Sequence, residues 1–152
     1  MADAYIVALT MLSRRELSEA QIRTRLVRRE FEDDEIEAAV ERLRQDGTLN
    51  DRRVALAAAR LESTVRHRGR SRVLQKLRSL GIDGEVAEAA VNEVFEEVDE
   101  GALLDRAFER RLRGQDPRHL DDKGRARILR GLAAQGFTFD AIMRRFKGNP
   151  DR

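Results

Sequence analysis

The chain has 152 residues with 41% hydrophobic and 38% charged side chains, and its formal net charge is only +2. It contains no cysteine, which excludes disulfides and thiolate metal sites. The apolar N-terminal run is short and starts with Asp3 instead of basic residues, so we expect neither a signal peptide nor a membrane span there. We therefore expect a cytoplasmic protein. Strong helix formers dominate and aromatics make up 5%, which predicts an all-α fold.

The sequence repeats its apolar pattern three times, which is typical of stacked units that share a core. The aligned apolar positions are Ile22, Leu26, Phe31 and Val40, then Val73, Leu77, Ile82 and Val91, then Ile128, Leu132, Phe137 and Phe146. Each repeat has room for three helices. We therefore predict three tandem, stacked three-helix repeats at residues 1–49, 50–98 and 99–148, with a frayed tail at 149–152.

Glycines mark the end of one helix in two of the copies. Gly81 precedes Ile82 and Gly136 precedes Phe137, which is where a helix commonly ends in a left-handed residue. The first copy has Glu30 at this position, so its turn either differs in geometry or holds Glu30 in a costly left-handed conformation.

Helix boundaries follow from capping residues and periodicity. Ser18 with Gln21 forms a capping box, and Asp33, Asp83 and Thr138 are expected N-caps. Within residues 51–67, Val54, Ala58, Leu61 and Val65 form an apolar stripe with helical spacing. The predicted helices cover residues 4–14, 18–29, 33–46, 51–67, 70–80, 84–98, 99–113, 122–135 and 138–147.

Charge follows the repeat as well, and 27 of the 30 basic residues are arginine. The second helix of each repeat is basic, whereas the third helix of the first two repeats is acidic. Recurring basic residues on one face suit phosphates or an acidic protein surface, and the pattern does not distinguish these partners. Alternatively, they are solvated side chains paired with neighbouring helices. We call this set the basic band: Arg25, Arg28, Arg68, Arg72, Lys76, Lys123, Arg127 and Arg130.

Residues that support catalysis are nearly absent. His67 lies between two arginines, and the Asp116 to His119 spacing is interrupted by Pro117, so neither histidine predicts a metal site. The chain has no glycine-rich phosphate loop and no serine with a histidine at a suggestive spacing. We expect no enzyme activity, no catalytic residue, no cofactor and no metal.

The order of several short motifs resembles the RecX family, bacterial regulators of the RecA recombinase. The resemblance spans roughly residues 5–147, and Glu30 departs from the family pattern, which has glycine there. The matching stretches are Leu9 to Ser18, Asp46-Gly47-Thr48-Leu49-Asn50-Asp51-Arg52, Arg66 to Arg72, Leu77-Arg78-Ser79-Leu80-Gly81-Ile82, and Gln135 to Ile142.

This resemblance implies that the repeats form an elongated, curved array, and it also implies a function. Members of the family bind the RecA filament on single-stranded DNA and lodge along its groove. They inhibit its ATP hydrolysis and strand exchange, and so modulate recombination, DNA repair and the SOS response. The expected partners are therefore the RecA filament and single-stranded DNA, with duplex DNA bound weakly, and the expected form is a monomer.

Two other functions stay open. A helix-turn-helix-like DNA-binding protein could place a basic helix in a major groove, but the acidic third helices of the first two repeats would be repelled. A helical adaptor between proteins would need no nucleic acid at all, and binding to a DNA-free partner would favour it.

Overall fold

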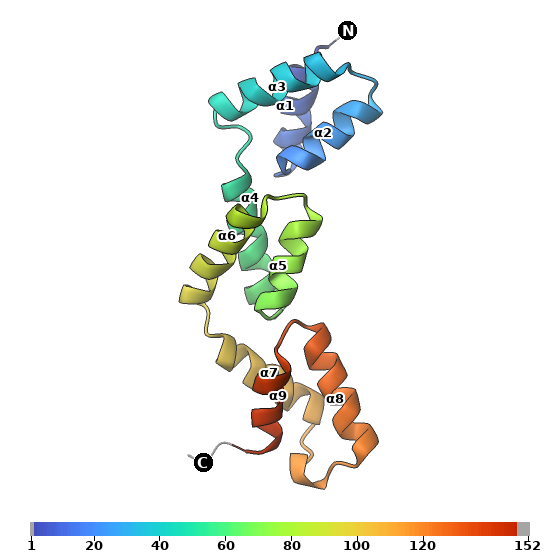
Figure 1. Cartoon of the computed structure of the whole chain (residues 1–152), viewed down its shortest axis with the longest axis vertical. Helices are drawn as coiled ribbons and strands as arrows, with labels where there is room; N and C mark the ends of the chain where they lie inside the picture. The colour runs from blue at the N-terminus through green and yellow to red at the C-terminus, as the bar shows by residue number, and fades with distance from the viewer. Residues whose placement is uncertain (1, 149–152) are drawn as a thin grey trace. The chain divides into compact units, whose positions relative to one another are not determined.

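The computed structural model describes residues 2–148, in which helices are joined by short loops and no strand occurs (Figure 1). Nine α-helices occur in it, together with a π-helical turn, η1 (Leu61–Val65), and a 3-10 turn, η2 (Pro117–His119). The α-helices are α1 (Ala4–Arg14), α2 (Glu19–Arg28), α3 (Asp33–Gln45), α4 (Asp51–Arg60), α5 (Arg70–Ser79), α6 (Gly84–Glu97), α7 (Glu100–Leu112), α8 (Asp122–Ala134) and α9 (Phe139–Phe146). The all-α repeat fold is confirmed. The predicted tail at 149–152 lies outside the described residues.

The chain divides into two compact units. One comprises the described residues up to Ala58 together with Lys76–Ala90, and the other comprises Ala59–Gln75 together with the described residues from Val91 onward. The middle repeat contributes to both units. The repeat boundaries after residues 49 and 98 stay a prediction.

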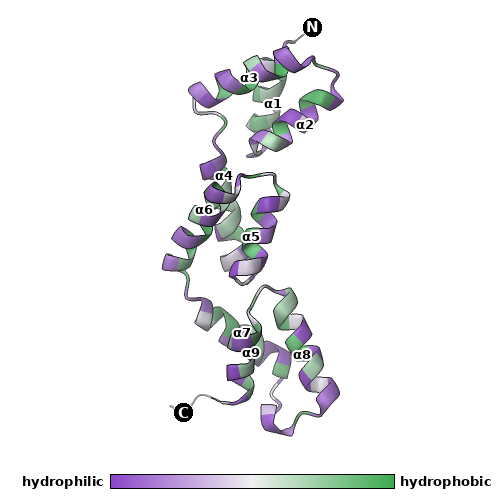
Figure 2. Ribbon diagram, viewed as in Figure 1, coloured by the Kyte–Doolittle hydropathy of each residue, from purple (hydrophilic) through white to green (hydrophobic). Residues whose placement is uncertain are grey.

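Each helix has one apolar face, visible in Figure 2 as alternating green and purple segments. In the first unit α1, α2 and α3 bury a core that includes Ala8, Ile22, Leu26, Val40 and Leu43. In the second unit α7, α8 and α9 bury Leu104, Phe108, Ile128, Leu132 and Ile142, among others. The three leucines predicted at equivalent core positions, Leu26, Leu77 and Leu132, are all completely buried.

The same turn ends the second helix of every repeat. Glu30, Gly81 and Gly136 have φ values of 67°, 75° and 105°, so the left-handed conformation predicted for the glycines is confirmed, and Glu30 adopts it too. In each copy the amide three residues past the last helical residue donates to a leucine carbonyl. These bonds join Phe31 to Leu26 (3.3 Å), Ile82 to Leu77 (3.4 Å) and Phe137 to Leu132 (3.3 Å). This is the Schellman pattern, and it explains why glycine is the usual residue there.

Most of the predicted caps are confirmed. Ser18 and Gln21 form a capping box, and the Thr138 hydroxyl accepts from the amide of Ala141. Asp83 stands directly before α6, and its carboxylate accepts from the amide of Glu85 at 3.2 Å. Asp33 was wrong as an N-cap. The helix starts one residue earlier than a cap at Asp33 would require, so Glu32 occupies the cap position without a side-chain hydrogen bond.

The apolar stripe of α4 (Asp51–Arg60) and η1 (Leu61–Val65) is not buried in its second half. Leu61 and Val65 are 45% and 64% exposed, whereas Glu62 and Ser63 are 3% and 0% exposed. The buried face follows Ala55, Ala59 and Ser63 instead, and the last turn widens into π-helix with the Arg66 amide bonded to the Leu61 carbonyl. The buried polar groups are satisfied, since the Ser63 hydroxyl donates to the Ala59 carbonyl at 2.8 Å and the Glu62 carboxylate accepts from Arg66 at 2.9 Å.

Candidate nucleic-acid and partner interface

Seven of the eight basic-band residues lie on the second helices of the repeats. Arg25 and Arg28 are on α2, Arg72 and Lys76 on α5, and Lys123, Arg127 and Arg130 on α8. The eighth was misplaced by the sequence analysis. Arg68 lies in the loop before α5, which begins at Arg70, so it does not share a helical face with Arg72 and Lys76.

The three band residues of α8 form a regular row. Lys123, Arg127 and Arg130 are all exposed, and their spacing places them on one side of the helix. Ile128 and Leu132 on the other side are buried in the core, and Leu129 packs partly against it. The predicted division of α8 into a basic face and a core face is thus seen in the structure.

Within the described part of the chain, the basic band has no ion-pair partners of its own. Among the described residues, no basic-band side chain forms a salt bridge, and the one hydrogen bond given by a band side chain joins Arg72 to Gln75 at 2.9 Å. Many arginines outside the band do pair with carboxylates, including Arg23, Arg44, Arg53, Arg60, Arg66, Arg118 and Arg145. The band is therefore not neutralised by neighbouring helices, and its positive charge is left to solvent or a partner.

Arg25 and Arg28 line a shallow hollow of about 260 Å³ in the first unit, between α2 and the end of α5. Its two walls are joined by a hydrogen bond of 2.5 Å from the Ser18 hydroxyl to the Leu80 carbonyl. Gly81 touches Ala20 so closely that a side chain at position 81 would overlap its Cβ atom. Gly81 thus serves both the left-handed turn and the close approach of α5 to α2.

A second pair of glycines fixes the loop that carries Arg68. The Gly69 amide donates to the Gln135 carbonyl at 2.8 Å, and a Cβ atom at Gly69 would lie 2.7 Å from the carbonyl carbon of Gly136. A Cβ atom at Gly136 would in turn lie 2.5 Å from Cβ of Arg72. The loop before α5 and the turn after α8 are therefore in backbone contact, which brings Arg68 and Arg72 to the end of α8.

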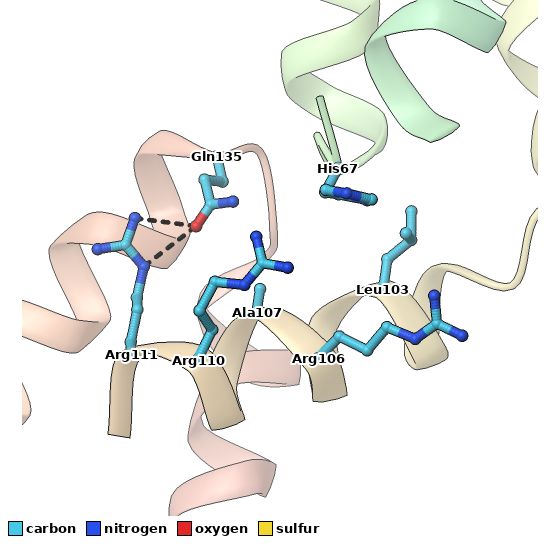
Figure 3. Close-up of a pocket in the computed structure, with 7 residues that line it drawn as sticks. All are labelled: His67, Leu103, Arg106, Ala107, Arg110, Arg111 and Gln135. Atoms are coloured by element: carbon cyan, nitrogen blue, oxygen red, sulfur yellow. Dashed lines mark hydrogen bonds between the residues drawn. The ribbon is translucent and has the colours of Figure 1, made fainter. Parts of the chain in front are cut away.

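The structure also contains an arginine cluster that the sequence analysis missed. Arg106, Arg110 and Arg111 of α7 border a hollow of about 210 Å³ in the second unit (Figure 3). We call it the arginine hollow, and its lining residues are His67, Leu103, Arg106, Ala107, Arg110, Arg111 and Gln135. The sequence signal was available, because Arg106 and Arg110 are four residues apart in a predicted helix and Arg111 follows directly.

The loop containing Asp116 and His119 is held by an ion pair. The Asp116 carboxylate accepts from the Arg118 amide and guanidinium, both at 2.9 Å, and these bonds lower the pKa of Asp116 to about 2. No group of three or more potential metal ligands occurs within residues 2–148. None of the helices in the same range is both long and apolar enough to cross a bilayer.

Comparison with known proteins identifies the family of the chain. Over 145 residues it is 37% identical to the regulatory protein RecX of Syntrophotalea carbinolica, and the alignment covers 95% of this chain and 94% of that one. The chain belongs to the RecX family. The RecX of Pseudomonas entomophila is 32% identical over 93% of this chain and 88% of its own length. Residues 4–43, which include α1 and α2 and most of α3, match the model of the first three-helix domain of RecX.

Solved RecX structures share the fold. The crystal structure of RecX from Lactobacillus salivarius superposes with a TM-score of 0.80 and covers 92% of this chain and 90% of that chain, at 20% identity. A second RecX crystal structure gives a TM-score of 0.81 over 96% of this chain and 70% of that chain. The relatives at 37% and 32% identity are named regulatory proteins.

Proposed function

We propose that this RecX-family protein binds the RecA recombinase filament on single-stranded DNA and inhibits its ATP hydrolysis and strand exchange. In this role it modulates recombination, DNA repair and the SOS response in the cytoplasm, acts as a monomer, and binds duplex DNA only weakly. It works by occupying the filament and catalyses no reaction of its own.

One observation carries the proposal beyond family membership. The basic band recurs on the second helix of each repeat, and its side chains form no salt bridge among the described residues. Like charges spaced three or four residues apart on a helix repel each other and cost about 0.2–0.5 kcal/mol per pair. A protein that keeps such rows unpaired gives up stability, and an anionic partner would recover it.

The test is an ATP hydrolysis titration with recombinase filaments from the same source at fixed concentration. We expect inhibition that saturates with added protein and does not grow with incubation time, because occupancy and not turnover produces it. Inhibition should weaken as salt rises, since exposed charges are screened beyond about 10 Å at 0.1 M ionic strength. A folded helical protein that gives no inhibition at any ratio would defeat the proposal and favour the adaptor function.

A further inference from the structure

The arginine hollow concentrates positive charge without any acidic residue in its lining. Its polar groups are the guanidinium groups of Arg106, Arg110 and Arg111, the imidazole of His67 and the amide of Gln135. Arg106 and Arg110 are exposed, and neither has a hydrogen bond or ion pair with another described residue. On the same helix, Asp105 is engaged elsewhere, because its carboxylate accepts from Arg145 at 2.8 Å. No carboxylate of the described residues thus lines the hollow, and Glu109, which precedes Arg110 in α7, also lies outside its lining.

One side of the hollow is held in place by contacts within the protein. The Arg111 guanidinium donates from Nε and Nη2 to the Gln135 side-chain oxygen, at 3.1 and 2.9 Å. It lies across Gly131 of α8, where any side chain would overlap it. His67 has a left-handed backbone with φ of 56°, and the Gly69 to Gln135 backbone bond of 2.8 Å holds its loop against the end of α8. Such preorganisation lowers the entropy cost of binding.

The three guanidinium groups are spread along a row and do not converge on one point. Figure 3 shows Arg111 against Gln135, Arg110 pointing into the space between Gln135 and His67, and Arg106 at the other end, near Leu103. The floor is apolar, since Leu103 and Ala107 both line the hollow and are each 8% exposed. A row of forked cations beside an apolar floor and an imidazole ring matches a chain of phosphates with attached bases better than a lone carboxylate.

We infer that the arginine hollow binds the phosphate backbone of a single nucleic-acid strand, as a site separate from the basic band. Arg106 and Arg110 contact phosphate oxygens, and Arg111, held by Gln135, closes one end of the row. Leu103, Ala107 and His67 provide the surface for the sugar or base. The choice of single-stranded DNA as this strand rests on the proposed function, whereas the phosphate chemistry rests on the hollow itself.

The experiment measures binding of the full chain to a short oligothymidylate over a range of salt concentrations. The double variant Arg106→Gln with Arg110→Gln keeps good helix formers at exposed positions, and circular dichroism verifies its fold. We expect affinity to fall about tenfold or more. The slope of log affinity against log salt should fall by about 0.7 for each phosphate that the variant leaves unbound. Changing both arginines to lysine should largely keep the salt slope but weaken binding, because the forked geometry is removed.

The matched control is Arg144→Gln with Lys147→Gln. Both residues are exposed, belong to the same unit and do not line the hollow, and their substitution removes the same charge as the hollow variant does. We expect at most about a twofold effect from the control. If the hollow variant binds oligothymidylate as tightly as the control does, the inference is overturned. It is also overturned if the hollow variant loses binding to poly-glutamate but keeps binding to oligothymidylate, because the partner is then an acidic protein segment.

Failure here differs from failure of the proposed function. Unchanged strand binding by the hollow variant, together with filament inhibition by the wild-type protein, overturns only the phosphate site. Loss of strand binding by the hollow variant, together with no filament inhibition by the wild-type protein, supports the phosphate site and removes the regulator proposal.

Discussion

The hydroxyl of Ser18 donates a hydrogen bond to the carbonyl of Leu80, 62 residues along the chain, at 2.5 Å. The same hydroxyl accepts from the Gln21 amide at 3.1 Å, while the Gln21 side chain accepts from the Ser18 amide at 2.9 Å. Ser18 is completely buried. One side chain therefore caps α2 and ties it to the end of α5, beside the hollow that Arg25 and Arg28 line.

Replacing Ser18 with alanine should destabilise the protein markedly. The loss of an N-cap costs about 0.5–2 kcal/mol, and the partly buried Leu80 carbonyl left without its donor costs about 1–3 kcal/mol more. We expect a decrease of about 2–4 kcal/mol in the free energy of unfolding, measured by urea denaturation. The control is Ser13→Ala, since the exposed Ser13 hydroxyl bonds only to the Thr10 carbonyl and should change stability by about 0.5 kcal/mol or less. Equal effects of the two variants would contradict a stabilising role for the Ser18 cap and for its hydrogen bond to Leu80.

The equivalent core leucines should be costly to truncate. Leu77 and Leu132 are fully buried, one in each unit, and Leu→Ala at such positions typically costs about 2–5 kcal/mol. Leu61→Ala is the control, because Leu61 is 45% exposed and its truncation should cost far less. Urea denaturation midpoints would rank the three variants. A cost for Leu77→Ala no larger than that for Leu61→Ala would contradict the repeat core.

Replacing Glu30 with glycine should stabilise the first repeat. A non-glycine residue in the left-handed region costs about 1–2 kcal/mol, while glycine adds about 0.4–1 kcal/mol of entropy to the unfolded chain. The balance is a gain of about 0.5–1 kcal/mol, measurable as a rise in thermal midpoint. The opposite change, Gly81→Ala, should destabilise strongly, because position 81 is both left-handed and in contact with Ala20. A less stable Glu30→Gly variant would show that the Glu30 side chain has a stabilising contact of its own.

The features predicted correctly from sequence are those that local chemistry determines. Apolar spacing identified Leu26, Leu77 and Leu132 as core, and glycine after the helix identified the turns at Gly81 and Gly136. The arginine hollow escaped prediction because it exists only where the loop of His67 meets α7 and the end of α8. The apolar stripe did not reveal which face is buried after α4, because the chain there widens into a π-helical turn in which Ser63 is buried and Leu61 is exposed.

Aspartate titration should occur in a defined order. Burial raises the pKa of Asp51, whose carboxylate accepts from the Glu19 amide at 2.8 Å, whereas the bonds from Arg118 lower the pKa of Asp116 to about 2. On acidification Asp51 should become protonated at a pH above 3.8, the ordinary pKa of aspartate, and Asp116 at a pH far below it. Carboxyl NMR shifts would follow both titrations. Because its folded pKa is depressed, Asp116 stabilises the fold above pH 3.8, and this contribution is lost as pH falls toward about 2. Arg118→Ala should return the Asp116 midpoint toward 3.8, and an unchanged midpoint would contradict the ion pair as its cause.

Reversing the charge of the basic band should weaken filament and DNA binding without loss of helicity. The variant carries Arg72→Glu, Lys76→Glu and Arg127→Glu, which belong to the second helices α5 and α8 and have no ion pair with another described residue. The salt slope on single-stranded DNA should fall by about 0.7 for each phosphate that the variant no longer binds. Inhibition of filament ATP hydrolysis should require correspondingly more protein.

The control variant reverses the charge of Arg78, Arg113 and Arg144. These arginines are exposed and lie outside both the band and the arginine hollow, and their reversal changes the net charge by the same amount. If the band variant loses more binding than the control variant, the position of the charges determines binding and the net charge does not, because the net charge changes equally in both variants. If the two triple variants behave alike in affinity, salt slope and inhibition, the basic band is only a solvated face.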